Sequence, residues 1–265
     1  MHRGVKVAIW IWLAVLLSAV ILWFAGRREP DYNGKPLTSW LQNPPLFSEE
    51  ADDETSDSGR AAVAVRHIGT NAVPYLARLV RVKDSPFKTL VLSALPSFHS
   101  AAAMLRPAKE TREMAAFGFY ALGPMGKGAV PALTESLQDR DAGVVYHAAR
   151  SLGFIGPDAE PAIPRLLALV HHPNRTIAWT AISSLAKIRK EPAVVVPTFI
   201  TNLLSTNVIL HDRTLVALGD FGEQAKAATP FILPFLNDAD EMTRWDASNA
   251  LTRINSETAT KQPSR

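Results

Sequence analysis

Apolar residues recur along this chain at the spacing of an amphipathic helix. In the stretch VVYHAARSLGFIG, five of them take positions i, i+3, i+4, i+7 and i+10: Val145, Ala148, Ala149, Leu152 and Ile155. Residues at this spacing share one helix face, and an apolar face of this kind is normally buried against a neighbouring element. The pattern therefore predicts a helix here.

The helical pattern repeats with a fixed period. Leucines and prolines recur every 33 residues at Leu152, Leu185, Leu218 and Leu251 and at Pro164, Pro197 and Pro230. Earlier copies are looser: Leu122 precedes Pro131, and Val65 precedes Pro74, by nine residues where the later copies have twelve. Residues 85–106 read as a divergent copy. A period of this length indicates a solenoid, whose units bury their apolar faces only against their neighbours.

Glycines and prolines mark the helix boundaries in each unit. We expect the first helices to end at the aligned positions Gly126, Gly156, Arg189, Gly222 and Asn255, because Gly and Asn suit a left-handed residue after a helix. The second glycine of each Gly-x-x-Gly segment is therefore expected to end a helix. The spacing does not predict a phosphate-binding loop.

Prolines are expected to fall near the start of the second helices. The second helix of the third unit is expected to begin near Asp158 and Pro161, which leaves Pro164 in the first turn, where a missing N–H costs no hydrogen bond. Pro234 lies one turn deeper and should kink its helix.

The segments ALGPMGKGAVPAL and SLGFIGPDAEPAIPRLL resemble HEAT repeats, in particular the short bacterial type also found in phycobilin-lyase HEAT-like proteins. The resemblance covers residues 60–254 and is strongest over 113–254. It implies an all-α fold, an α-solenoid of stacked antiparallel helix pairs, here with about five units. This chain departs from the family pattern by ending in a lone terminal helix, and we expect a disordered tail at 255–265. It also implies that second helices line a concave side that binds protein, with exposed candidates at Arg165, Thr198 and Phe231.

A different pattern occupies the N-terminus. Residues 7–25 contain no charged side chain, and as a helix they would span about 28 Å, close to the roughly 30 Å hydrocarbon core of a bilayer. We therefore expect one transmembrane helix within residues 1–26, with a cleaved signal peptide as the alternative. This predicts a single-pass membrane protein whose solenoid lies on the extracytoplasmic, periplasmic side.

Charge is unevenly distributed within a net +3. Residues 27–59 read as a juxtamembrane segment that ends in an acidic linker, since 48–59 carry a net −6. Residues 60–112 carry +7 and residues 113–265 carry −1. The acidic stretch is expected to be solvated, with a clasp on the neighbouring basic region as the alternative. Candidate contacts to an anionic surface in that region are Arg78, Arg81, Lys83 and Lys88.

No residue pattern predicts catalysis, a cofactor or a metal site. The chain has no cysteine, which excludes thiolate ligands and a Cys nucleophile, and it lacks the common zinc, calcium, serine-hydrolase and nucleotide motifs. We expect a non-catalytic scaffold that binds another protein, with no small-molecule substrate. The alternatives are an accessory lyase-like enzyme of the phycobilin-lyase type, or an anionic-lipid or nucleic-acid binder through residues 60–112. The near-neutral remainder of the chain argues against nucleic acid.

Aromatic residues occupy corresponding positions on three first helices, at Tyr146, Trp179 and Trp245. We interpret them as packing between stacked units. A ladder of aromatic side chains that binds a ligand is the alternative.

Overall fold

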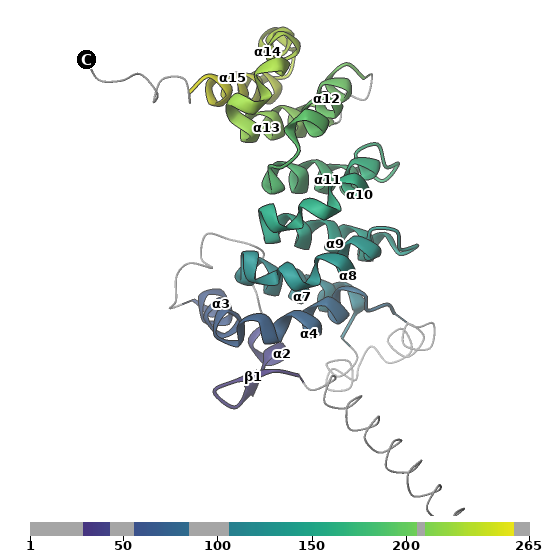
Figure 1. The fold of residues 1–265 in the computed structure, drawn as a ribbon, viewed down its shortest axis with the longest axis vertical. Helices are drawn as coiled ribbons and strands as arrows, with labels where there is room; N and C mark the ends of the chain where they lie inside the picture. Colours follow the sequence, from purple (N-terminus) through teal and green to yellow (C-terminus); the bar gives the residue numbers. More distant parts are fainter. Residues whose placement is uncertain (1–28, 43–55, 85–105, 206–209, 257–265) are drawn as a thin grey trace, which may run out of the picture.

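The computed structural model describes residues 29–42, 56–84, 106–205 and 210–256, which form an elongated stack of helices in chain order (Figure 1). The first helices of successive units are α3 (Asp57–Ile68), α7 (Ala108–Leu122), α9 (Ala142–Ile155), α11 (Arg175–Ile188) and α13 (His211–Phe221). The second helices are α4 (Val73–Val80), α8 (Val130–Ser136), α10 (Ile163–Leu169), α12 (Pro192–Leu203) and α14 (Thr229–Ile232), and α15 (Glu241–Ser256) comes after them. The predicted α-solenoid is confirmed.

Short 3-10 segments join the two helices within most units. They are η2 (Gly69–Ala72), η3 (Gly123–Ala129), η4 (Gly156–Ala162) and η6 (Gly222–Ala228), and η7 (Leu233–Asn237) continues the chain after α14. The connection between α11 and α12 is different, because only residues 189–191 separate these two helices.

Polar caps and prolines explain where the helices begin. The side chains of Asp141 and Asn174 accept backbone N–H groups at the starts of α9 and α11, which satisfies donors that have no intrahelical acceptor. Proline is the second residue of α4, α8, α10 and α14, where its missing N–H costs no hydrogen bond. Pro234 does more than kink its helix, since α14 ends at Ile232 and the chain continues as η7.

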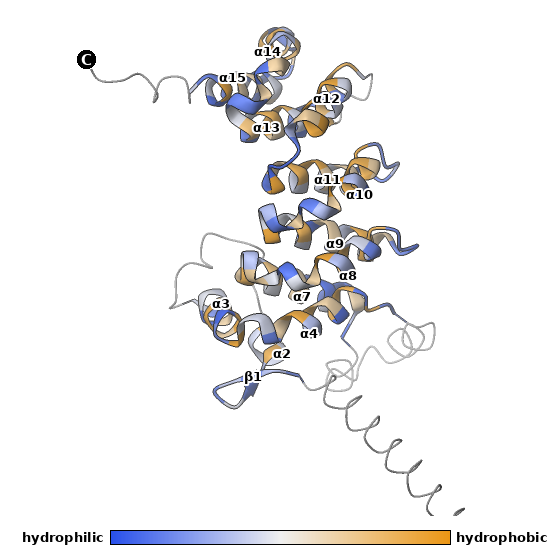
Figure 2. Cartoon of the chain, viewed as in Figure 1, coloured by the Kyte–Doolittle hydropathy of each residue, from blue (hydrophilic) through white to orange (hydrophobic). Residues whose placement is uncertain are grey.

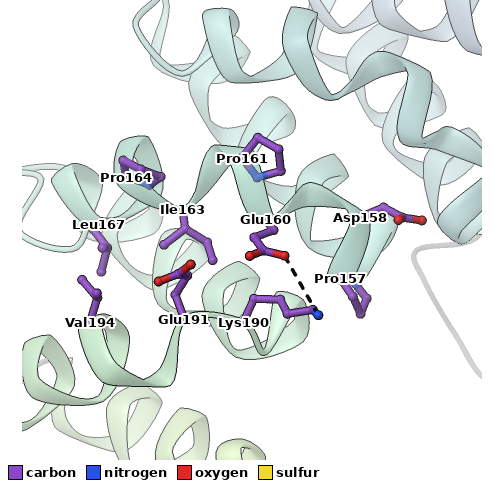
Figure 3. A pocket seen from close by; sticks show the side chains of 10 residues that line it. All are labelled: Pro157, Asp158, Glu160, Pro161, Ile163, Pro164, Leu167, Lys190, Glu191 and Val194. Atoms are coloured by element: carbon purple, nitrogen blue, oxygen red, sulfur yellow. Dashed lines mark ion pairs between the residues drawn. The ribbon is translucent and has the colours of Figure 1, made fainter.

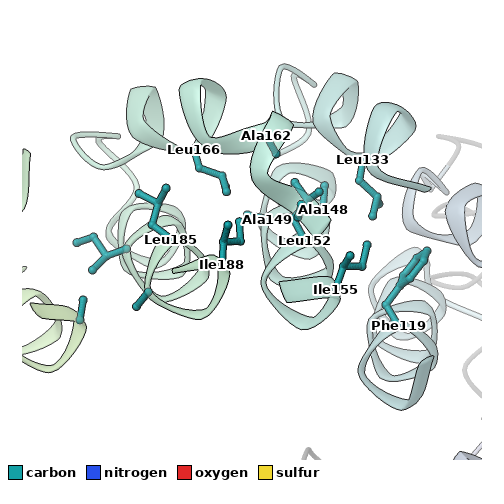
Figure 4. Packing of buried hydrophobic residues seen from close by; sticks show 14 of the residues in the cluster. Phe119, Leu133, Ala148, Ala149, Leu152, Ile155, Ala162, Leu166, Leu185 and Ile188 are labelled. Carbon is teal, nitrogen blue, oxygen red and sulfur yellow. The ribbon is translucent and has the colours of Figure 1, made fainter. Parts of the chain in front are cut away.

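One apolar core runs along the whole described stack, from Leu37 near its beginning to Ile254 near its end. Leu133 of α8 points toward Ile155 of α9, and Leu166 of α10 points toward Leu185 and Ile188 of α11 (Figure 4). Apolar and polar residues alternate around each helix, and the loop tips are polar (Figure 2). Each unit therefore completes its core only with its neighbours, as expected of a solenoid.

The N-terminal end of the stack is closed by a small hairpin and one helical turn, namely β1 (Asp31–Tyr32), β2 (Lys35–Pro36) and α2 (Leu37–Trp40). The turn between the strands has positive φ at both Asn33 and Gly34, as a tight hairpin turn requires. Leu37 and Leu41 are fully buried in the same core as α3. The solenoid's first helix begins at Asp57, within the stretch that we expected to be linker.

The glycine positions correct part of the sequence alignment. Gly123, not Gly126, comes directly after the end of α7, and it precedes Gly156 by 33 residues, as Pro131 precedes Pro164. The period therefore extends to α7 without the shorter gap that we inferred, while Gly126 lies buried in η3 against Phe119 and Ile155. The expected end at Asn255 is also wrong, because α15 continues to Ser256.

The expected divergent unit at 85–106 lies almost entirely outside the described residues. The structure nevertheless shows that α4 and α7 are direct neighbours, since a Cβ on Gly118 would meet the Leu76 side chain at 2.6 Å. Arg81 Nε also donates to Ser136 Oγ of α8 at 2.9 Å. The units that contain α4 and α7 are therefore neighbours in the stack.

The predicted membrane location is corrected. In the part of the chain that the structure describes, no helix is both long and apolar enough to cross a bilayer. The longest described helix, α15, has 16 residues and carries charged side chains along its length, whereas a span needs about 20 mostly apolar residues. The proposed span itself, residues 7–25, lies outside the described residues.

Candidate protein-binding surface

The three residues predicted to bind protein lie on one side of the stack. This side, here called the second-helix side, is formed by α4, α8, α10, α12 and α14. Arg165 of α10 is exposed. Thr198 of α12 is half-buried, and its hydroxyl donates to the Val194 carbonyl at 3.0 Å. Phe231 of α14 is half-buried and packs against the core. Of the three, only Arg165 is fully available to a partner.

A cavity of about 730 Å³ opens on this side between the third and fourth units (Figure 3). We call it the joint cavity, and its lining comes from η4 and α10 on one side and from the start of α12 on the other: Pro157, Asp158, Glu160, Pro161, Ile163, Pro164, Leu167, Lys190, Glu191 and Val194. A volume of several hundred Å³ with an apolar lining is typical of sites that take a ligand or an inserted side chain.

The backbone at Arg189 explains why the joint is irregular. In the other units the first helix is succeeded by a glycine with φ between 51° and 75° and ψ between −130° and −141°, at Gly69, Gly123, Gly156 and Gly222. Only glycine adopts that region readily. Arg189 instead has φ 51° and ψ 37°, the left-handed conformation that residues with a Cβ can enter. We had predicted the left-handed conformation for the glycines that end first helices too, and for those glycines the prediction is wrong.

The conformation of Arg189 shortens the connection to the second helix. Glu191 is also left-handed, and α12 begins directly at Pro192, so the fourth unit lacks the seven-residue 3-10 segment found as η3, η4 and η6. The joint cavity lies at this place, where η4 faces the start of α12. The absence of glycine at this joint was visible in the sequence, but the cavity was not.

The rim of the joint cavity is acidic. Asp158, Glu160 and Glu191 line it together with one cation, Lys190, whose Nζ lies 4.0 Å from Glu160 Oε2 (Figure 3). An ion pair this long and this exposed contributes little to stability. The rim therefore keeps an excess of negative charge around an apolar floor.

Three large apolar side chains within or just after the second helices are exposed in the described residues. Val194 beside the cavity is 48% exposed, Leu204 just after α12 is 68% exposed, and Leu233 after α14 is 49% exposed. Among the described first helices from α3 to α13, no large apolar residue is exposed to this degree. Their exposure leaves these side chains available for contact with a partner. The sequence reasoning recognised this unit as one that lacks its glycines, but it did not single out Val194.

The residues predicted to contact an anionic surface are partly engaged within the protein. Arg81 donates to Ser136 Oγ and pairs with Glu135 at 2.8 Å, and Lys83 pairs with Asp139 at 2.7 Å. The Lys83 ammonium is the main reason that the pKa of Asp139 lies below its usual value. Arg78 stacks on the Tyr75 ring, and Lys88 lies outside the described residues. Arg81 and Lys83 thus join α4 to the next unit.

The aromatic positions on the first helices differ in their surroundings. Trp179 packs against the core, as we expected of packing between units, and Tyr146 is half-buried. Trp245 on α15 is 61% exposed, so packing does not account for it.

In the described residues, no three His, Cys, Asp or Glu side chains gather as a metal site would require.

Comparison with known proteins supports the fold class. The family described as HEAT repeats matches residues 99–186, about a third of the chain. No curated protein matches the sequence. The chain is therefore an α-solenoid that contains a segment similar to HEAT repeats, as the sequence resemblance implied.

Several solved structures are similar in fold. They include a designed armadillo repeat protein in complex with a (KR)4 peptide, at 15% identity over 83% of this chain and 98% of that one, with a TM-score of 0.48. The CpcE and CpcF complex of phycocyanin lyase from Nostoc sp. PCC7120 matches at 24% identity over 63% of this chain and 65% of that one, with a TM-score of 0.45.

The karyopherin Kap121p bound to the SUMO protease Ulp1p matches at 15% identity and a TM-score of 0.49, over 82% of this chain but only 23% of its own length. At these identities the likeness concerns the helical-repeat fold alone. Function has to be argued from the surfaces of this chain.

Proposed function

We propose that this protein is a non-catalytic scaffold that binds another protein on its second-helix side, with the joint cavity at the centre of the contact. The observation that carries the proposal is the exposed Val194 side chain at the edge of an apolar cavity with an acidic rim. A partner would insert an apolar side chain into the cavity and place a cation near Glu160 or Glu191. Arg165, Thr198 and Phe231 would contact the same partner along the stack.

The physical basis is the desolvation of apolar surface together with charge complementarity. Apolar anchors in pockets contribute most of the energy of a typical protein interface, and charges at the rim mainly fix orientation and association rate. The acidic rim therefore predicts a partner segment that is both basic and apolar.

The test compares the full 265-residue chain with Val194→Asp in a capture experiment from a cell extract. Val194 is exposed, so the substitution should leave the fold intact, which a thermal melt would verify. We expect specific proteins to be retained by the natural chain and lost with Val194→Asp. Arg165→Glu should weaken the same interaction.

Met242→Asp is the matched control, because Met242 is an exposed apolar residue on α15, away from the joint cavity. It should retain the same proteins as the natural chain. The proposal fails if the natural chain retains nothing above background, or if Val194→Asp retains the same proteins in the same amounts.

A further inference from the structure

A second hollow, of about 360 Å³, lies among the first helices α9, α11 and α13. We call it the first-helix groove. Three cations contribute to it, Arg150, Lys187 and Arg213, and no carboxylate does; the other lining residues are Tyr146, Thr176, Trp179, Thr180, Ser183 and Ser184. It contains two of the aromatic residues that we weighed as a ligand-binding ladder, and its charge is opposite to that of the joint cavity.

Aromatic rings hold these cations in place. Lys187 Nζ lies 4.3 Å from the centre of the Phe154 ring, and Arg213 Cζ lies 5.6 Å from the Trp179 ring. Arg150 Nη1 donates to Tyr146 Oη at 3.3 Å. Cation–π contacts position a charge without neutralising it, so the groove keeps its positive charge.

The cations of the groove have acids in their surroundings, since Glu113 acts on Arg150 and Arg213 acts on Asp246. Neither Lys187 nor Arg213 forms an ion pair with any described residue. Asp220, the acid that acts on Lys187, is paired with Arg253 at 2.5 Å. Desolvation lowers the pKa of Lys187, and repulsion from Arg150 lowers it further. A negative charge placed beside Lys187 would offset both effects, because it favours the protonated form.

The hydroxyl groups in the groove restrict the kind of anion that fits. Thr180, Ser183 and Ser184 each donate their hydroxyl hydrogen to a backbone carbonyl, at 2.8, 2.9 and 2.8 Å. Their oxygens can then only accept hydrogen bonds. A peptide with acidic side chains offers both N–H donors for these oxygens and negative charge for the cations.

We propose that the first-helix groove binds an acidic peptide segment of a partner, with Glu or Asp carboxylates on Lys187 and Arg213 and an apolar side chain against Tyr146 and Trp179. Peptide N–H groups would donate to the oxygens of Thr180 and Ser183. This site lies on different helices from the joint cavity and takes a partner of the opposite charge. It therefore stands or falls separately from the proposed function.

The test measures binding of a fluorescein-labelled Glu-Glu-Leu-Glu-Glu peptide to the full chain by fluorescence anisotropy, with Lys-Lys-Leu-Lys-Lys as the opposite-charge probe. We expect the acidic peptide to bind, with an affinity that falls with added salt. Any binding of the basic peptide, which suits the acidic rim of the joint cavity, should not change with substitutions in the groove. The double substitution Lys187→Glu with Arg213→Glu should weaken binding at least about tenfold, since each reversal replaces an attraction by a repulsion. Lys187→Gln with Arg213→Gln, which adds no negative charge, should also weaken binding, and a thermal melt of each variant verifies folding.

Lys226→Glu provides a matched charge reversal at an exposed position in η6 and should change the affinity less than about twofold, since exposed charges away from a site are largely screened. Val194→Asp should leave peptide binding unchanged. The inference is overturned if the acidic peptide does not bind, if the double reversals bind it as the natural chain does, or if Val194→Asp abolishes binding. Tighter binding of single-stranded RNA than of the peptide would also overturn it.

Discussion

At the residue scale, the position after each first helix shows how one side chain changes a repeat. Gly156 and Arg189 occupy corresponding positions, 33 residues apart, yet glycine turns the chain into a 3-10 segment and arginine turns it directly into α12. The difference lies in ψ, which is −141° at Gly156 and 37° at Arg189. Arg189 Nε also donates to the Asp220 carbonyl, which holds the joint to the next first helix.

The first prediction concerns Gly156→Ala. No atom lies within 4 Å of a Cβ added at Gly156, so the effect is conformational alone, and we expect a loss of about 1–3 kcal/mol in the free energy of unfolding. Urea denaturation measures it. Gly128→Ala is the control, because Gly128 does not have positive φ and its Cβ would meet only Val73 at 3.7 Å. A loss of similar size at Gly128 would contradict the backbone explanation.

The second prediction concerns pH and His147. This residue is buried in α9, and desolvation, together with the charges of Arg112, Arg150 and Lys109, lowers its pKa from 6.5 to about 3, against a weaker opposing effect of Asp141. Between these values the unfolded chain binds the proton and the folded chain does not. The stability is therefore complete above pH 6.5 and falls as the pH drops toward 3, by at most about 1.4 kcal/mol per pH unit from this group.

The measurement is the free energy of unfolding at about pH 7 and about pH 4.5, on either side of the unfolded pKa, for the natural chain and for His147→Gln. The natural chain should lose more stability than the variant over this interval, since the variant lacks the titrating group. Equal losses in the two proteins would show that His147 does not carry the effect.

At the element scale, one of the three Gly-x-x-Gly segments differs from the other two, since LGDFG places Gly219 inside α13 and Gly222 at its end, as LGFIG does in α9. In LGFIG the first glycine, Gly153, lies inside α9 and the second ends it, whereas in LGPMG the first glycine, Gly123, ends α7. A Cβ on Gly153 would lie 3.0 Å from Ser184 Cα of α11, and one on Gly219 would lie 3.1 Å from Ala250 Cα of α15. These glycines let neighbouring first helices approach closely.

The third prediction is that Gly153→Ala destabilises the protein despite the higher helix propensity of alanine. The propensity gain is about 1 kcal/mol, while forcing apart two packed helix backbones typically costs about 1–3 kcal/mol. We expect a net loss, measured by the urea midpoint. A gain in stability from Gly153→Ala alone would contradict the close-packing argument.

Most elements could be predicted from the sequence because they depend on local patterns. The helix face around Leu152, the period of 33 and the proline at the start of α10 all rest on spacing and on the chemistry of the residues concerned. The alignment was wrong at Gly123 because LGPMG and LGFIG share the same glycine spacing, although the helix ends at the first glycine in one segment and at the second in the other. The joint cavity could not be predicted, since it depends on the ψ angle of Arg189 and on the contact between two units.

At the scale of the whole molecule, the two ends of the described stack are closed differently. The N-terminal end is covered by α2, through Leu37 and Leu41. At the other end, α15 packs on α13 through Ala250 and Ile254, and Trp245 stays exposed. In a stack of this kind each unit is stabilised only by its neighbours, so a weakened end should affect the nearest units and not the distant ones.

The last prediction tests this with Ile254→Ala, which removes a side chain that is 1% exposed in α15. Truncating a buried isoleucine costs about 2–5 kcal/mol. Hydrogen exchange read by mass spectrometry should show faster exchange in α13 and α15 and unchanged exchange in α7 and α9. Ile155→Ala, a central substitution of the same kind, should instead accelerate exchange in α9 and on both sides of it. A uniform increase over all described helices with Ile254→Ala would contradict this prediction. It would mean that the chain unfolds as one cooperative unit, because all helices then exchange through the same global opening.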